Sequence, residues 1–274
     1  MPKVFDTFPF FNELRLLDIR LHELSDVVDY FVLVESDATR RGTKKPLYFA
    51  ENRDLFEPFL DKIISLTMPY PHLSEKECEI KQRNMILDAI KDKATDDDII
   101  IVSDADEIPR ASKIPMLKEM ERPVLMQAWL YYYYLNGLAA RDYPLAPVAC
   151  RYGDLLSHYK TCHDLRVGVI YDGKNNGAKR RSTVMKNASW HFSWIGGIDR
   201  IIEKARAFHR PDRKWDTSKF LGRERITRMV NEGFHISGRS ENRIVYYGSI
   251  DGTFPKYLVE NQTKFSDMIY MGVN

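Results

Sequence analysis

Short apolar runs alternate with longer helical patterns over the first hundred residues. Leu14, Leu17, Leu21 and Leu24 recur at helical spacing, and a second helical pattern covers residues 75–93. The apolar runs are rich in Val, Ile and Phe, which is typical of strands buried on both faces. This alternation predicts an α/β fold with a mostly parallel central sheet and helices on both sides. The predicted strands are residues 4–8, 30–34, 63–66 and 98–103.

The pattern becomes less regular after residue 110, where prolines are frequent. We expect this part of the chain to add an α+β elaboration to the same sheet. Because no change of composition marks a linker, we expect a single domain over residues 1–274. The predicted strands here are residues 124–135, 166–171 and 182–192, and the predicted helices are residues 199–208 and 217–232.

Charge is unevenly distributed along the chain. The formal net charge is +2, but the first 110 residues carry 23 acidic and 15 basic side chains. A protein that binds the nucleic-acid backbone would not be acidic over its first third, so we expect no nucleic-acid partner. A local site for an anion remains compatible with this distribution.

The amino terminus and the longest uncharged run bear on the location of the protein. Asp6 falls where a signal peptide needs its apolar segment, so we expect a cytoplasmic protein. The longest uncharged run covers residues 123–140, but it includes Gln127, Asn136 and four consecutive tyrosines. Hydrocarbon solvates these groups poorly, so we expect no transmembrane segment.

The three cysteines, Cys78, Cys150 and Cys162, are widely spaced. An odd number at this spacing indicates neither a disulfide framework nor a zinc knuckle. Cys150 and Cys162 together with His158 and His163 are an alternative metal-binding set, although their spacing matches no familiar site.

Three carboxylates directly follow the most apolar predicted strand. Asp104, Asp106 and Glu107 lie within four residues, and ligands of open α/β sheets bind beyond the carboxyl ends of strands. Asp104 and Asp106 are two positions apart, so both can direct oxygens at one hard cation. A divalent cation would also relieve the repulsion between the acids, and Mn²⁺ or Mg²⁺ suits oxygen ligands best. The alternative is that these acids cap a helix that begins near Pro109.

Five motifs, one of them this acidic segment, resemble glycosyltransferase family 17 in their residues and their order. They cover most of residues 3–210. The motifs are FDTFPFFNEL (5–14), VVDYFVLVES (27–36), KPLYF (45–49), SDADEIP (103–109) and WHFSWIGGID (190–199).

The resemblance implies a glycosyltransferase of the GT-A type that inverts the anomeric carbon. It implies a nucleotide-sugar donor, most simply UDP-GlcNAc, a glycan acceptor, and a metal ion held by Asp104 and Asp106. We expect residues 1–110 to bind the nucleotide sugar and residues 111–274 to bind the acceptor.

Several residues of the first half are candidates for donor binding. Glu35 ends a predicted strand and can accept hydrogen bonds from ribose or base. Thr7 and Phe8 end the first strand and can flank the uracil, although Phe8 equally suits the core. Arg83 carries a planar guanidinium that suits a pyrophosphate or a carboxylate, and its alternative is a solvated helix charge. Asp104 can reach the ribose or a metal-bound water.

The WHFSWIGGID motif resembles the late metal and phosphate site of other GT-A enzymes. His191 is the candidate third metal ligand beside the two aspartates. Gly197, after Gly196, would let backbone N–H groups approach the diphosphate at a helix start, and Lys204 would contact the same phosphates.

An inverting transfer needs a carboxylate base that takes the proton of the acceptor hydroxyl. Asp199 resembles the base position of some GT-A families. Asp142 and Asp164 are rivals in the middle of the chain, and Glu107 is a further candidate for an acceptor contact. Residues 141–172, where the resemblance implies the acceptor contacts, depart from the family pattern.

Three alternatives to a UDP-GlcNAc transferase stay open at this point. The same scaffold could use UDP-xylose, UDP-glucose or a GDP-sugar, because groups that hold a diphosphate do not select the sugar. A nucleotidyltransferase would need a glycine-rich loop after the first strand, and residues 7–11 contain no glycine. A non-catalytic glycan-binding module would explain the many aromatic residues but not the clustered acids. The oligomeric state is not encoded in any recognisable feature.

Overall fold

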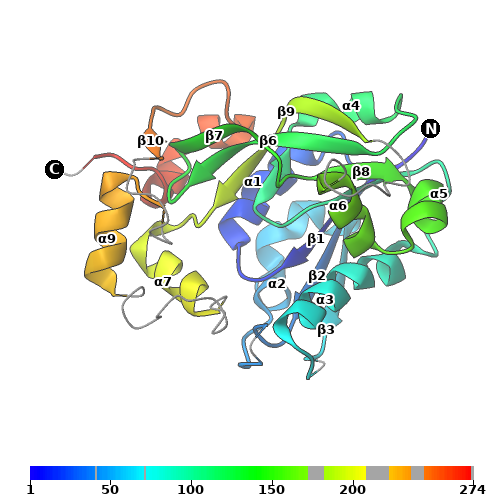
Figure 1. The fold of residues 1–274 in the computed structure, drawn as a ribbon, viewed down its shortest axis with the longest axis horizontal. Coiled ribbons are helices and arrows are strands. Elements are labelled where there is room, and N and C mark those ends of the chain that lie inside the picture. The colour runs from blue at the N-terminus through cyan, green and yellow to red at the C-terminus, as the bar shows by residue number, and fades with distance from the viewer. Residues whose placement is uncertain (41, 71, 172–181, 208–221, 236–243, 273–274) are drawn as a thin grey trace. The chain divides into compact units, whose positions relative to one another are not determined.

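The computed structural model describes residues 1–40, 42–70, 72–171, 182–207, 222–235 and 244–272 (Figure 1). The chain divides into two compact units. Unit 1 comprises Met1–Ala128 and Tyr143–Trp190, and unit 2 comprises Trp129–Asp142 and His191–Asn274. The sequence-based division at residue 110 stays a prediction.

Unit 1 is built on four parallel strands in the order β3-β2-β1-β4. The register pairs Thr7 of β1 with Val32 of β2 and with Val102 of β4, so all three strands end at one edge. Each predicted strand of the first hundred residues is confirmed, with small shifts of its ends. The strands are β1 (Val4–Phe10), β2 (Tyr30–Ser36), β3 (Ile63–Met68) and β4 (Ile99–Val102).

Beyond β4 the sheet of unit 1 becomes antiparallel. Strand β8 (Val148–Arg151) pairs antiparallel with β4 and with the start of β6 (Val124–Tyr132). The short strand β5 (Glu107–Pro109) pairs with β9 (Thr183–Ser193). The sheet is therefore mixed, and its parallel part is the part that the alternating sequence predicts.

The parallel strands bury both of their faces, as their continuous apolar sequences predict. Alternate residues such as Phe8 and Leu33 pack with helix α1 (Leu14–Leu24) on one face. Their neighbours, such as Val32, pack on the other face with α3 (Glu75–Ile90) and α6 (Cys162–Ile170), which lie side by side in Figure 1. The α/β class with helices on both sides is thus confirmed.

Two helices of unit 1 show how their sequences fix their starts. Ser74 accepts a hydrogen bond from the backbone of Glu77 while the Glu77 carboxylate accepts from the backbone of Ser74, which forms a capping box for α3. Helix α6 occupies residues that the sequence predicts as the strand 166–171, and this prediction is wrong. The Thr161 side chain caps the helix, and Leu165 and Val169 are buried at helical spacing.

Short elements complete unit 1. They are α2 (Tyr48–Glu51), α4 (Ile114–Leu117), α5 (Tyr152–Asp154), the 3₁₀ segments Arg53–Lys62 and Ala111–Lys113, and the π-helical turn Leu155–Tyr159.

Unit 2 surrounds a smaller core that Tyr133, Ile201, Val230 and Val245 help to form. Within it, β10 (Tyr246–Tyr247) pairs antiparallel with β7 (Gly137–Tyr143). Its helices are α7 (Gly197–Ala207), α9 (Arg223–Glu232) and α10 (Lys256–Glu260), followed by the 3₁₀ segment Gln262–Met268. Helices α7 and α9 confirm the two predicted helices, except for residues 208 and 217–221, which lie outside the described residues. Strands β6 and β9 each have residues in both units and confirm the predicted strands 124–135 and 182–192, except that β6 ends at Tyr132.

None of the helices in the described part of the chain is both long enough and apolar enough to cross a membrane.

Candidate functional site

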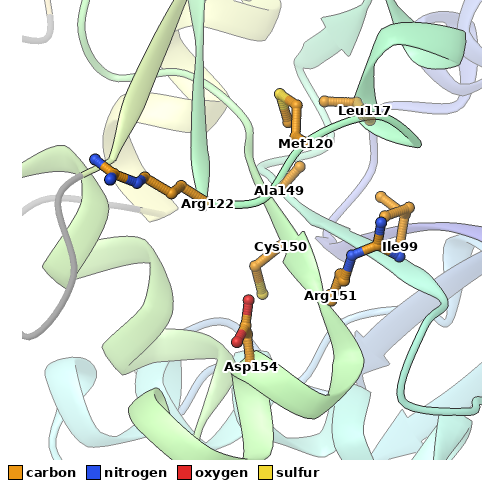
Figure 2. Close-up of a pocket in the computed structure, with 8 residues that line it drawn as sticks. All are labelled: Ile99, Leu117, Met120, Arg122, Ala149, Cys150, Arg151 and Asp154. Atoms are coloured by element: carbon orange, nitrogen blue, oxygen red, sulfur yellow. The ribbon is translucent and has the colours of Figure 1, made fainter.

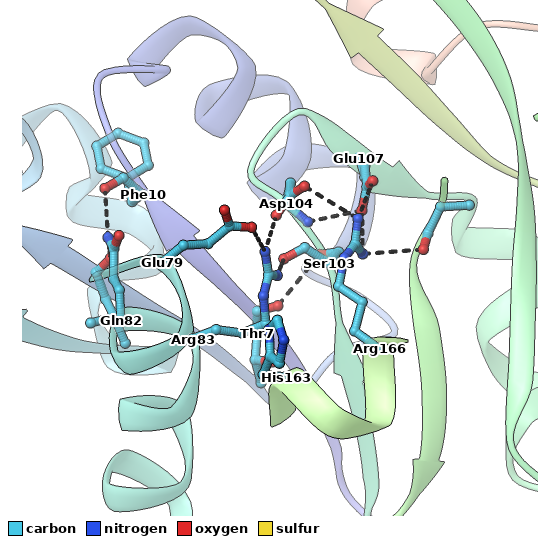
Figure 3. Close-up of polar contacts among 12 residues, drawn as sticks. Thr7, Phe10, Glu79, Gln82, Arg83, Ser103, Asp104, Glu107, His163 and Arg166 are labelled. Atoms are coloured by element: carbon cyan, nitrogen blue, oxygen red, sulfur yellow. Dashed lines mark hydrogen bonds and ion pairs between the residues drawn. The ribbon is translucent and has the colours of Figure 1, made fainter. Parts of the chain in front are cut away.

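The acidic cluster lies directly beyond β4, at the edge where the parallel strands end (Figure 3). Asp104 begins a turn that the hydrogen bond from the Glu107 backbone N–H to the Asp104 carbonyl closes, and Glu107 then starts β5. The nearest following helical segment begins only at Ala111. The alternative that these acids cap a helix near Pro109 is therefore wrong, because the chain there is extended.

A buried arginine donates hydrogen bonds to the backbone of this turn. Arg20 of α1 is fully buried, and its guanidinium donates to both oxygens of Asp6, at 2.6 and 2.5 Å, and to the Ser103 hydroxyl at 2.6 Å. Its remaining nitrogen, Nη1, donates to the carbonyls of Asp104 at 3.0 Å and Glu107 at 2.9 Å. The backbone of the acidic turn is thus tied to β1 and α1 through one side chain.

Two further arginines meet the carboxylate of Asp104. Arg83 Nη2 lies 2.8 Å from Oδ1, and Arg166 Nη2 lies 3.2 Å from Oδ2 (Figure 3). Arg166 also contacts both oxygens of the fully buried Glu107, at 2.6 and 2.8 Å. Figure 3 shows both guanidinium groups pointing toward the turn, Arg83 from α3 and Arg166 from α6.

These contacts set the charge of the groups. Burial opposes ionisation of Asp104, but the Arg166 and Arg83 guanidiniums outweigh it and hold the pKa of the Asp104 carboxyl well below its usual range. Burial likewise opposes the charge of Arg166, yet Asp104 and Glu107 raise the pKa of that guanidinium above its ordinary value. Asp104 and Arg166 are therefore both ionised at neutral pH.

The chemistry of the donor set fits a hard cation, but the carboxylates are already engaged. Asp104 and Asp106 offer the oxygen ligands that Mn²⁺ or Mg²⁺ prefers. Asp106 is 8% exposed, and both oxygens of Asp104 meet guanidiniums. Among the described residues, no three His, Cys, Asp or Glu side chains lie close enough together to form a set of metal ligands. The alternative set of Cys150, Cys162, His158 and His163 therefore does not come together either.

The family of the chain follows from comparison with known proteins. The model of glycosyltransferase family 17 matches residues 1–269. The chain belongs to glycosyltransferase family 17. It is therefore a glycosyltransferase, and the resemblance carried by the five motifs is confirmed.

Curated relatives of this family-17 chain match part of its sequence. The human β-1,4-mannosyl-glycoprotein 4-β-N-acetylglucosaminyltransferase is 34% identical over 116 residues, which are 39% of this chain and 22% of the human protein. The mouse protein of the same name is 33% identical over 116 residues, which again are 39% of this chain and 22% of the mouse protein. The matched part thus spans about a fifth of the length of these relatives.

Solved structures resemble the family-17 chain more remotely. Glucosyl-3-phosphoglycerate synthase from Mycobacterium tuberculosis is 14% identical with a TM-score of 0.40, covering 92% of this chain and 88% of that one. A 4-diphosphocytidyl-2C-methyl-D-erythritol synthase is 13% identical with a TM-score of 0.38, covering 81% of this chain and all of that one.

Thr7 and Phe8, predicted near the uracil, have interior positions in this family-17 structure. The Thr7 hydroxyl donates to the Ile101 carbonyl at 2.7 Å, and both side chains are fully buried. The Arg20 guanidinium stacks over the Phe8 ring at 4.1 Å from its centroid. Of the two interpretations for Phe8, the structure supports the core, because no face of the ring reaches the surface.

Glu35 anchors a loop. Its carboxylate, 3% exposed, accepts from the backbone N–H of Phe49 at 3.1 Å and of Ala50 at 3.4 Å, and Lys45 Nζ lies 3.5 Å away. These contacts tie the start of α2 to the end of β2. Burial raises the pKa of Glu35 above its ordinary value, although Lys45 and the two N–H groups act in the opposite direction. The hydrogen bonds predicted for a donor are thus made to the protein itself.

The remaining predicted residues belong to unit 2. His191 is a half-buried residue of β9, and Gly196 and Gly197 have φ angles of +117° and +79° at the start of α7. Glycine adopts these positive φ angles readily because it has no Cβ. Asp199 of α7 pairs with Arg223 of α9 and remains 82% exposed.

Two other predicted residues of unit 2 have different surroundings. Lys204 Nζ lies 5.9 Å from the centroid of the Trp194 ring. Asp142 is exposed near the end of β7 and has a φ of +58°. The structure thus gathers Asp104, Asp106, Glu107 and Arg83 in unit 1, and it places His191, Gly197, Asp199, Lys204 and Asp142 in unit 2.

A pocket in unit 1 lies at the opposite end of β4 from Asp104 (Figure 2). It encloses about 220 Å³, including the open space at its mouth. Ile99, the first residue of β4, lines it together with Cys150 and Asp154. The enclosed part of this space, about 10 Å³, holds no more than about one water molecule, so the pocket is too small for a nucleotide sugar.

Reasoning from the sequence missed Arg20 and Arg166. A signal for Arg20 exists, because Asp6 inside a buried strand requires a cationic partner. Arg166 gave no such signal, because its stretch of sequence resembles a strand.

Proposed function

We propose that this glycosyltransferase inverts the anomeric carbon of a nucleotide sugar, most simply UDP-GlcNAc, as it transfers the sugar to a hydroxyl of a glycan. The family match and the names of the curated relatives support the chemistry and the choice of sugar. The observation that carries the site is the acidic turn, which Arg20 fixes beyond the ends of the parallel strands. Ligands of open α/β sheets bind at such an edge.

Breaking the bond to the sugar leaves negative charge on the departing diphosphate, which the site must stabilise. Arg83 and Arg166 bring two guanidiniums to the turn, and planar guanidiniums suit phosphate oxygens. Asp104 and Asp106 would hold Mn²⁺ or Mg²⁺, which when bound supplies further positive charge to the diphosphate. Metal dependence is part of the proposal.

The acceptor hydroxyl must lose its proton to a base. Glu107 is unsuited to this role, because it is fully buried and both of its oxygens contact Arg166. Asp199, at 82% exposed, and Asp142 are accessible carboxylates. We assign the base to Asp199, with Asp142 as the rival, because Asp199 follows the Gly196-Gly197 pair at the start of α7.

The competing activity is sugar-nucleotide synthesis. Such an enzyme binds a nucleoside triphosphate, typically through a glycine-rich loop, and β1 is followed here by Phe11 and Asn12. Other donors, including UDP-xylose, UDP-glucose and GDP-sugars, remain alternatives for the same scaffold. The cytoplasmic location expected from the sequence stays a proposal that cell fractionation tests.

A thermal-shift screen with UDP, GDP, UTP and several nucleotide sugars, each with and without Mn²⁺, tests the proposal. Selective binding to the folded state raises the melting temperature, so we expect stabilisation by UDP and UDP-GlcNAc in the presence of Mn²⁺. Transfer to a panel of glycans, followed by mass spectrometry, then identifies the acceptor. Stabilisation only by UTP together with sugar phosphates would favour the nucleotidyltransferase.

A pair of variants locates the site. Asp106→Ala should abolish the metal-dependent UDP shift and turnover while the protein remains folded. Asp97→Ala is the matched control, because it removes the same charge before β4, where the side chain is 86% exposed. An active Asp106→Ala enzyme would count against the acidic turn as the donor site.

A further inference from the structure

The Asp104 carboxylate is the accessible end of an otherwise buried cluster. Its side chain is 41% exposed, whereas those of Arg83 and Arg166 are 2% and 10% exposed. Each oxygen of Asp104 carries one guanidinium, at 2.8 and 3.2 Å. A cation that bound Asp104 through both oxygens would therefore have to separate the carboxylate from two arginines.

The two arginines are held in place by groups other than Asp104. Arg166 binds both oxygens of Glu107 and donates to the Ala146 carbonyl at 3.2 Å. Arg83 donates to the Ser103 carbonyl at 3.2 Å and lies 3.6 Å from Glu79, and its buried Nε has no hydrogen-bond partner. If Asp104 turned away, both guanidiniums would stay beside the turn with a free N–H each.

Leaving a buried arginine without its carboxylate is costly unless another partner replaces the one that is lost. The anionic oxygens of a diphosphate are suitable replacements, because they accept charge-assisted hydrogen bonds from arginine. Arg83 and Arg166 would thus oppose a cation that arrives alone. They would oppose it much less when a diphosphate arrives with it.

We propose that Arg83 and Arg166 occupy the Asp104 carboxylate in place of a divalent cation and transfer to the donor diphosphate when a cation is bound there. The inference rests on the proposed function, and it adds a coupling between metal and donor. Because coupling is reciprocal, UDP should tighten Mn²⁺ binding by the same factor by which Mn²⁺ tightens UDP binding.

Isothermal titration calorimetry of Mn²⁺ with and without saturating UDP measures this coupling, and the manganese EPR signal of free Mn²⁺ checks the metal affinity independently. We expect UDP to tighten Mn²⁺ binding at least about tenfold in the unaltered chain. Equal Mn²⁺ affinity with and without UDP would overturn the inference and, because coupling is reciprocal, also the metal dependence of the proposed function, but not the transfer of a sugar from a nucleotide donor. If neither UDP nor any other nucleotide bound under either condition, both would fail.

The variant Arg83→Gln separates this exchange from simpler roles. It should bind Mn²⁺ alone more tightly than the unaltered chain by several-fold, bind UDP more weakly, and show a smaller coupling. An arginine that only contacts phosphate would weaken UDP binding without changing the affinity for Mn²⁺ alone. An arginine that only maintains the fold would weaken both, and either result would overturn the inference.

Two further variants serve as a control and as a replacement for Arg83→Gln. Arg40→Gln removes the same charge near the cluster from a side chain that pairs with Glu79 at 2.8 Å, and it should change Mn²⁺ affinity much less than Arg83→Gln does. Circular dichroism and the melting temperature establish that Arg83→Gln is folded. If it is not, Arg83→Lys keeps the charge and loses one of the two donor contacts, and Mn²⁺ binding tighter than in the unaltered chain is again the expected result.

Discussion

Arg20 and Asp6 form a fully buried ion pair in which Nη2 meets Oδ1 at 2.5 Å and Nε meets Oδ2 at 2.6 Å. The same guanidinium donates to the carbonyls of the acidic turn beyond β4. A pair that never reaches the surface therefore determines the backbone of the turn that presents Asp104 and Asp106.

Removal of one partner of this pair should be strongly destabilising. Arg20→Met leaves the Asp6 charge buried without a cation, and the expected loss of unfolding free energy is about 3–5 kcal/mol. The double variant Arg20→Met/Asp6→Leu removes both charges and should be less destabilised than either single variant. Urea denaturation of the three proteins measures the difference, and additive losses would show that the two residues act independently.

The parallel half of the fold was predictable because its sequence is locally consistent. Each strand from β1 to β4 is an apolar run buried on both faces, and the polar positions of α3 mark its start through the capping box at Ser74. Helix α6 was not predictable, because residues 166–171 contain too few residues to separate a helical period from an apolar run. Its helical state depends on packing against α3.

The acidic side chains of the candidate site were predictable from the sequence, but two of its arginines were not. Asp104, Asp106 and Glu107 are neighbours in sequence, so their clustering needs no knowledge of the fold. Arg20 and Arg166 lie far along the chain in either direction and meet the turn only through tertiary structure. The sequence suggested a metal as the neutralising charge, and the structure places arginines on Asp104 and Glu107.

The contribution of Asp104 to stability should depend on pH in the acid range. Its arginine partners lower its pKa below the ordinary value of 3.8, so the stabilisation is complete above that value and is lost as the pH falls below it. Asp104→Asn should lower the unfolding free energy at pH 7 by about 1 kcal/mol, a modest loss because the side chain is 41% exposed.

Urea denaturation of both proteins between pH 7 and pH 3.5 checks this dependence. The difference between the unaltered chain and Asp104→Asn should shrink by about 0.5 kcal/mol over that range. A difference that stayed constant or grew towards low pH would contradict the lowered pKa.

The cysteines should be unreactive in the folded protein. Burial raises the pKa of Cys162 to about 12 and that of Cys150 well above its ordinary value, and Cys78 is also buried. At pH 8 the reactive thiolate of Cys162 is thus present at about one part in ten thousand. With Ellman's reagent we expect almost no reaction under native conditions and three equivalents in guanidinium chloride. Rapid native labelling of one thiol would show that its environment opens.

A variant of Glu35 tests whether its carboxylate anchors the loop or binds the nucleotide-sugar donor. Glu35→Gln weakens the contacts with Lys45 and with the N–H groups of Phe49 and Ala50, so we expect a loss of about 1.5–3 kcal/mol in unfolding free energy. As an anchor at the end of β2, Glu35 should affect UDP affinity by no more than about twofold, or about 0.4 kcal/mol. Glu51→Gln is the matched control, because Glu51 accepts from Leu47 on the exposed side of the same loop and should alter stability much less. A tenfold loss of UDP affinity in folded Glu35→Gln would instead identify the carboxylate as a ligand of the donor.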